Sequence, residues 1–127
     1  MITYNEIIEA LQMQDDDKEV YFDFCRAFPL LEVASWRGVY SEPAIDWAVN
    51  RRSQHFRPHK APTVKELREY LTDKIGTPLY GYKGGEFRLK GQSLLYVDGD
   101  GEYTSTVITR VVRSGPDVIL VTQTFPW

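Results

Sequence analysis

Helical periodicity is confined to two short segments of the chain, and this limits the folds that it can adopt. In each segment a threonine, Thr3 or Thr63, is followed three residues later by a glutamate, which is the capping-box pattern of a helix N-terminus. Apolar residues then recur at the spacing of one helical face. They are Tyr4, Ile7, Ile8 and Leu11 in the first segment, and Val64, Leu67, Leu71 and Ile75 in the second, which ends at Gly76 and Pro78. The sequence therefore predicts two short amphipathic helices.

Much of the remaining chain has the composition and alternation of β-strands. Apolar and polar residues alternate over 20–25, which places Cys25 in a strand. Further strand-like segments cover 80–89, 94–97, 103–113 and 118–125. The loop 114–117, of sequence SGPD, joins the last two as a hairpin, whereas 35–59 is the least regular part. We expect an α+β fold in a single domain over 1–127, with a mostly antiparallel sheet, two short amphipathic helices and a C-terminal β-hairpin.

The composition supports one ordered domain. The chain has 127 residues, of which 43% are hydrophobic and 13% aromatic, and these values argue against a disordered protein. No apolar run approaches the ~20 residues of a membrane-spanning helix, and the first residues lack the basic and apolar regions of a signal peptide. The single cysteine cannot form an internal disulfide, which suits a reducing compartment. We therefore expect a cytoplasmic protein with no membrane partner.

The charge of the chain is divided between its two parts. Residues 1–50 carry ten acidic and three basic side chains, a net charge of −7, whereas residues 51–127 carry eight acidic and twelve basic ones, a net charge of +4. A local basic region on an acidic protein disfavours binding to a nucleic acid polymer. It fits a small anionic ligand, or subunits that pair acidic with basic surfaces. For most of these residues, simple solvated charge is the better explanation.

Motifs for catalysis and for metal binding are weak. His55 and His59 have a spacing found in zinc sites, but no cysteine pair accompanies them. Asp98, Asp100 and Glu102 resemble the start of a calcium loop, yet the glycine and the final glutamate of that loop are missing. The chain has no nucleophile elbow and no Cys-x-x-Cys motif. We expect no catalytic residues, no metal and no cofactor.

Two dense segments are candidates for ligand binding. The segment 81–87 (GYKGGEF) combines glycines, aromatic rings and a lysine, but lacks the ending of a P-loop. The segment 35–43 places aromatic rings beside an arginine, as at sites where bases stack and phosphates pair with a guanidinium. A β-bulge and a hydrophobic core would explain the same residues equally well. The candidate ligand residues come from these two segments and from a later strand-like segment, which adds two arginines. They are Arg37, Tyr40, Tyr82, Lys83, Gly84, Gly85, Phe87, Arg110 and Arg113.

The two arginines belong to the strand-like segment 103–113. Arg110 interrupts apolar neighbours, so it has to be exposed, paired or bound to an anion. In a regular strand Arg110 and Arg113 would lie on opposite faces. A salt bridge within an assembly is the alternative to anion binding.

Four sequence blocks, taken in order, resemble a known family. They are YFDF at 21–24, SWRG at 35–38 with Tyr40, Thr63 and Val64 with Leu67, and GYKGGEF at 81–87. Over roughly residues 1–90 the chain resembles a family of small phage-encoded proteins, and within it the anti-Thoeris proteins. Those proteins sequester cyclic ADP-ribose-type immune signals without cleaving them, and some also hold cyclic oligonucleotides of the CBASS pathway.

The resemblance implies a homo-oligomer, a hexamer, whose ligand pockets are shared between subunits. One departure concerns the segment 44–47, which reads AIDW where a small apolar run ending in glycine is expected. This difference puts the shape of the pocket and the choice of ligand in doubt.

The leading hypothesis is a non-enzymatic phage protein that binds and sequesters nucleotide-derived immune signals in the cytoplasm of the infected bacterium. The alternative is a protein-interaction module that inhibits a host protein directly through its acidic N-terminal half. It predicts mutational sensitivity at Asp15, Asp16 and Asp17 rather than at the arginines. A third hypothesis is an enzyme that degrades the same signals, and it has the least support because no catalytic set is recognisable.

Overall fold

The computed structural model describes residues 1–36, 41–49, 60–81, 85–98 and 105–126. The helices are α1 (Tyr4–Gln12) and α2 (Val64–Lys74). The strands are β1 (Glu19–Phe22), β2 (Ala27–Ser35), β3 (Pro43–Val49), β4 (Pro78–Tyr80), β5 (Glu86–Arg88), β6 (Tyr96–Val97), β7 (Thr106–Ser114) and β8 (Asp117–Thr124). The expected α+β fold is confirmed.

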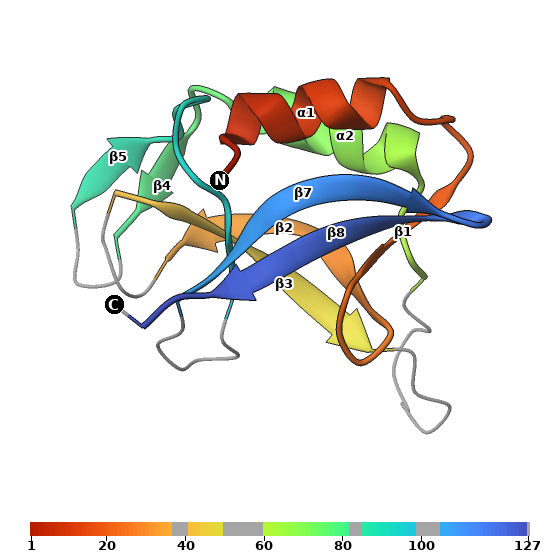
Figure 1. The fold of residues 1–127 in the computed structure, drawn as a ribbon. Helices are drawn as coiled ribbons and strands as arrows, with labels where there is room; N and C mark the ends of the chain where they lie inside the picture. The colour runs from red at the N-terminus through yellow and green to blue at the C-terminus, as the bar shows by residue number, and fades with distance from the viewer. Residues whose placement is uncertain (37–40, 50–59, 82–84, 99–104, 127) are drawn as a thin grey trace.

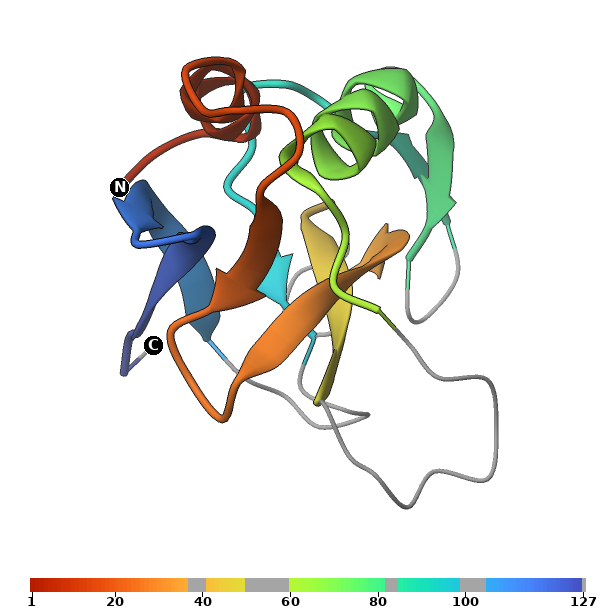
Figure 2. The same ribbon diagram turned by 90° about the vertical axis from the view of Figure 1, so that its right-hand side faces the viewer.

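Six strands form one sheet in the order β1-β8-β7-β6-β3-β2, and β4 and β5 form a separate two-stranded sheet. Within the large sheet, β2–β3, β6–β7 and β7–β8 are antiparallel, whereas β1–β8 and β3–β6 are parallel. β1 and β2 stand at opposite ends of this order, yet they follow one another in the chain and contact each other. The sheet is therefore strongly curled, as Figure 2 shows.

Both helices begin where the sequence predicts. At each N-terminus the threonine hydroxyl oxygen accepts a hydrogen bond from the glutamate backbone N–H, and the glutamate carboxylate accepts one from the threonine N–H. At the end of α2 the sequence-based prediction is wrong for Ile75, which is 39% exposed and lies beyond the last helical residue. The chain leaves the helix there because Ile75 has an extended backbone and Gly76 takes a φ of +81°.

The helices lie side by side and cover one end of the curled sheet (Figure 1). Their apolar stripes meet the inner face of the sheet in one buried cluster. Fully buried members include Leu11, Val20, Ile45, Leu67 and Ile108, which come from both helices and from strands β1, β3 and β7. The core therefore joins segments from the whole length of the chain.

Two strands fall outside the sequence-based prediction. β2 has a register shift between Pro29 and Val33, and its buried residues do not alternate with exposed ones. β3 has consecutive buried residues where it begins, at Pro43, Ala44 and Ile45. A search for regular alternation misses strands of this kind.

A first prediction concerns Tyr4, whose buried hydroxyl donates a hydrogen bond of 2.6 Å to the carbonyl of Leu71 near the end of α2. Burial raises the pKa of this phenol above its usual value of about 10. The folded protein thus keeps the phenol protonated at a pH where the unfolded chain ionises. This contribution to stability is complete below about pH 10 and is lost as the pH rises further.

We expect Tyr4→Phe to lower the free energy of unfolding by about 1–3 kcal/mol at pH 7, because it leaves a buried carbonyl without its partner. The deficit relative to the parent chain should shrink at pH 11. Urea unfolding at pH 7 and pH 11 measures the difference in free energy of unfolding between variant and parent. Tyr80→Phe is the control and should show little difference, because Tyr80 is 71% exposed. A deficit that grows between pH 7 and pH 11 would contradict the prediction.

Candidate functional site

The inner face of the sheet continues beyond the part that the helices cover. Along β8 the buried residues Val118 and Leu120 are followed, at the same two-residue spacing, by Thr122 and Thr124. Alternate residues of a strand share a face, so the row of core side chains runs on into polar ones. On β3, the same two-residue spacing leads from Ile45, which lies in the core, to Trp47.

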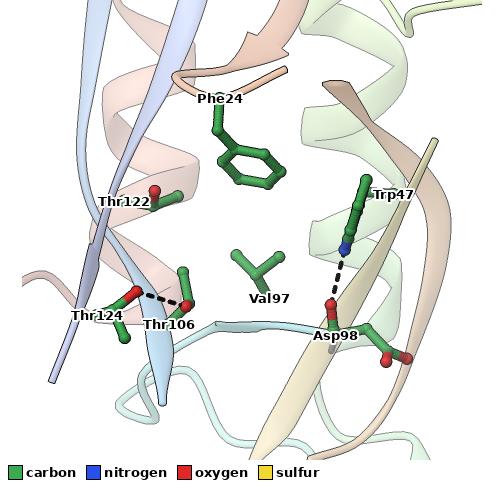
Figure 3. A pocket seen from close by; sticks show the side chains of 7 residues that line it. All are labelled: Phe24, Trp47, Val97, Asp98, Thr106, Thr122 and Thr124. Carbon is green, nitrogen blue, oxygen red and sulfur yellow. Dashed lines mark hydrogen bonds between the residues drawn. The ribbon is translucent and has the colours of Figure 1, made fainter. Parts of the chain in front are cut away.

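A pocket of about 390 Å³ lies at this end of the sheet. It is lined by Phe24, Trp47, Val97, Asp98, Thr106, Thr122 and Thr124, and we call it the aromatic–threonine pocket (Figure 3). Trp47, Val97, Thr106, Thr122 and Thr124 lie in β3, β6, β7 and β8, whereas Phe24 lies two residues after β1 and Asp98 directly follows β6. The pocket therefore combines β3 and the segment after β1 with strands from the C-terminal part of the chain.

Two aromatic rings form one side of the pocket. The Phe24 ring meets the Trp47 ring edge to face, with centroids 5.3 Å apart and planes at 90°, and it stacks on Phe22 at 5.2 Å. The Trp47 Nε1–H donates a hydrogen bond of 2.7 Å to the backbone carbonyl of Asp98. In Figure 3 the Trp47 ring is seen edge-on, so one of its faces is turned toward the opposite wall. The hydrogen bond and the Phe24 contact thus hold the tryptophan in place in the pocket wall.

The opposite wall consists of threonines. The hydroxyls of Thr106 and Thr124 lie 2.7 Å apart, across the β7–β8 pair. Thr122 donates from its hydroxyl at 2.6 Å and from its backbone N–H at 3.0 Å to the carboxylate of Asp23. This double contact ties the segment after β1 to β8, directly beside Phe24.

Phe24 is carried by a tight turn. The N–H of Ala27 bonds to the carbonyl of Phe24 at 2.9 Å, and Cys25 and Arg26 have φ values of 51° and 49°. Two successive positive φ values are the pattern of a type I′ turn, which costs energy at residues other than glycine. The expectation that Cys25 lies in a strand is wrong, because β1 ends at Phe22 and Cys25 is exposed in this turn.

The described lining of the pocket suits binding of a neutral polar ring system. It contains aromatic rings, three threonine hydroxyl groups that are hydrogen-bonded within the protein, and one carboxylate, but no lysine or arginine among the described lining residues. Within the part of the chain that the structure describes, no group of three or more His, Cys, Asp or Glu side chains is placed to hold a metal ion. In that same part, no helix has the length and apolar character needed to cross a membrane.

One titratable group outside the pocket has an unusual environment. The Oε2 atom of Glu42 is buried and has no hydrogen-bond partner in the described part of the chain. Burial raises the pKa of this carboxyl above its ordinary value. Glu42 precedes β3 and its carbonyl accepts the backbone N–H of Trp36, which stacks on Tyr96 with ring centroids 3.7 Å apart.

The candidate ligand residues from the sequence fall into two groups. Arg37, Tyr40, Tyr82, Lys83 and Gly84 lie outside the described residues, so their roles stay predictions. The other four are Gly85, Phe87, Arg110 and Arg113, and the structure does not bring them into one pocket.

The strand-like segment predicted over 80–89 takes in the end of β4 and the whole of β5. Phe87 lies in β5, and Gly85 directly precedes this strand. Gly85 has a φ of +87°, and its carbonyl accepts the N–H of Gly81 at 2.7 Å. Phe87 pairs in register with Leu79 and packs against the main core. These positions favour the structural explanation of both residues over ligand stacking.

Arg110 and Arg113 are exposed on β7, and their separation places them on opposite faces, as expected. A register shift interrupts the strand between Ile108 and Arg110. Arg113 is seven residues from Thr106 of the pocket, or about 23 Å along an extended strand. Arg110 lines a different groove, beside α1. Among the described residues, the aromatic–threonine pocket and the two arginines are thus separate features.

The acidic segment after α1 has a structural role. Asp16 forms an ion pair of 2.6 Å with Arg68 of α2, and its carbonyl accepts the N–H of Lys65. The carbonyl of Lys18 accepts the N–H of Val64 in the same turn. Part of this acidic segment therefore holds the start of α2 instead of standing free for a partner.

No family model, no curated protein and no solved structure matches the chain. The resemblance to phage anti-Thoeris proteins thus rests on its four sequence blocks. Sequence reasoning also missed the pocket. The clearest signal of the pocket in the sequence is the pair Thr122 and Thr124, which continues the alternate apolar residues Val118 and Leu120 with hydroxyl side chains.

Proposed function

We propose that the chain is a non-enzymatic binding protein whose pocket holds the base and ribose of a nucleotide-derived ligand. The observation that carries this proposal is the face of Trp47 standing opposite the three threonine hydroxyls. An aromatic face stacks on a nucleobase, and hydroxyls at the other wall bond to ribose oxygens. Ligand pockets usually span about 300–1,000 Å³. At 390 Å³, this pocket is the size for a nucleoside moiety.

The ligands that we propose are bacterial immune signals, namely cyclic ADP-ribose isomers or cyclic oligonucleotides. A phage protein that sequesters them in the cytoplasm of the infected cell blocks anti-phage defence, and a homo-oligomer does so with several sites. The four sequence blocks support this choice. The anionic part of such a ligand stays outside the described pocket lining, because that lining lacks a cation. Arg37 and Lys83 are the proposed partners for it, and Tyr40, Tyr82 and Gly84 stay candidate ligand residues.

Native mass spectrometry of the purified chain tests the proposal. We expect a mass increase equal to one whole ligand per site with at least one member of a panel of cyclic ADP-ribose isomers and cyclic di- and trinucleotides. Denaturation should return that ligand intact, since a sequestering protein breaks no bond. The same spectra give the oligomeric state.

Two controls define the outcome. Thr124→Val keeps the side-chain shape but removes a pocket hydroxyl, so it should weaken binding, whereas Thr72→Val on the exposed face of α2 should not. A ligand recovered in cleaved form would indicate an enzyme. A parent chain that binds no member of the panel would overturn the proposal.

A further inference from the structure

A second groove, of about 550 Å³, lies between helix α1 and strand β7. It is lined by Ile2, Glu6, Glu9, Ala10, Gln12 and Met13 on the side of the helix, and by Arg110, Val111 and Val112 on the side of the strand. It shares no described lining residue with the aromatic–threonine pocket. Figure 1 shows α1 running alongside β7 at this place.

The groove runs along the backbone edge of β7 and does not lie on either side-chain face of this strand. Successive side chains of a strand point to opposite faces of the sheet. Val111 packs against the main core, so Arg110 and Val112 point to the outer face. All three nevertheless line the groove. Three consecutive residues can do so only where the groove runs along the backbone edge of the strand.

Beyond Val107, this edge of β7 has no strand partner among the residues that the structure describes. On one side β8 pairs with β7 from Thr106 to Ser114. On the other side β6 pairs with it only at Val107, opposite Tyr96. In the described part of the chain no strand pairs with 109–113 on that side. Unpaired backbone N–H and C=O groups at a sheet edge are a template for a further strand.

We propose that this groove binds an extended peptide segment of a partner protein, which adds as a strand to the free edge of β7. Backbone hydrogen bonds supply the affinity in this mode, and alternate side chains supply the specificity. The occupant that the groove favours is a segment in which basic and apolar residues alternate.

The charges and apolar groups of the helix wall define that occupant. Side chains of an added strand that point to the inner face would meet Glu6 and Glu9, and α1 contains no lysine or arginine. Met13 is 84% exposed and Ala10 lies half-buried beside it, so both can pack against the aliphatic stem of a lysine. Side chains on the outer face would lie beside Val112 and the exposed Arg110, which favours apolar residues there and disfavours basic ones.

The test uses a fluorescently labelled peptide of alternating lysine and valine, acetyl-KVKVKVK-amide, with acetyl-EVEVEVE-amide as its acidic counterpart. We expect the purified chain to bind the basic peptide and not the acidic one in fluorescence anisotropy. Glu9→Lys should weaken binding by about two- to twentyfold, because it replaces attraction with repulsion. Glu69→Lys, which reverses an exposed charge on α2, is the matched control and should leave binding unchanged.

Hydrogen exchange distinguishes strand addition from a purely ionic contact. The bound peptide should slow exchange of backbone amides within 109–113 and leave the aromatic–threonine pocket unaffected. Peptide binding without that protection would overturn the proposal, as would equal binding of both peptides. Protection of 109–113 in a dimer of the free chain would also overturn it, because a second copy would then fill the groove. The Glu9→Lys variant should bind the same cyclic ADP-ribose isomers and cyclic oligonucleotides as the parent chain. Loss of peptide binding would thus contradict this proposal alone, and loss of nucleotide binding the proposed function alone.

Discussion

We expect Trp47→Ala to weaken capture of a nucleoside-containing ligand by about 5- to 150-fold. Stacking of a base on an aromatic ring contributes about 1–3 kcal/mol by alanine substitution. Trp47 offers the face across from the threonine wall, and its position is held by the hydrogen bond to the Asp98 carbonyl and by the Phe24 ring. Isothermal titration with the ligand found by mass spectrometry measures the change in Kd.

Two further variants separate stacking from folding. Trp47→Phe keeps an aromatic face but loses the Nε1–H donor, so it should retain more affinity than the alanine variant. Tyr80→Ala removes a ring that is 71% exposed on β4, outside the pocket, and should bind like the parent. Unchanged affinity in a folded Trp47→Ala variant would show that the ligand binds elsewhere. Circular dichroism establishes that each variant is folded.

The largest effect on stability is expected for Leu67→Ala. Leu67 is fully buried on α2, in the cluster where both helices meet the inner face of the sheet. Truncation of a buried leucine removes apolar contacts and leaves a cavity, and it typically costs about 2–5 kcal/mol. Urea unfolding should show a lower midpoint with little change in slope.

Leu31→Ala is the matched control, because the same truncation is made in β2 at a side chain that is 42% exposed. Its free energy of unfolding should stay within about 0.5 kcal/mol of the parent value. Similar losses for the two variants would mean that α2 does not pack against the sheet as described.

Local chemistry explains the parts of the fold that the sequence predicts. Each helix begins at a threonine–glutamate capping box, whose partners are three residues apart and meet without help from the rest of the chain. The loop 114–117 likewise joins two adjacent antiparallel strands, with Gly115 at a φ of +59°. Features of this kind depend on neighbours in sequence, so they can be recognised from it.

The remaining strands depend on distant partners. β1 lies parallel to β8, with Val20 opposite Val118. β3 lies parallel to β6, with Ile45 opposite Val97. Parallel neighbours are never joined by a tight turn, so no local motif announces them. β2 and β3 were missed for a related reason, because burial by distant segments replaces the alternation that a sequence pattern needs.

The candidate pocket shows the same division. The sequence by itself determined two capped helices, a C-terminal hairpin and the fold class, since capping, periodicity and turn chemistry act over a few residues. Only the tertiary structure decided that Phe24, Trp47 and the threonines face one another, and that Arg110 lies apart from them. Strands β8, β7, β6 and β3 are consecutive in the sheet, and the curl of the sheet turns their inner faces toward one another at one end. That curl arises from packing between residues distant in sequence, which no short motif records.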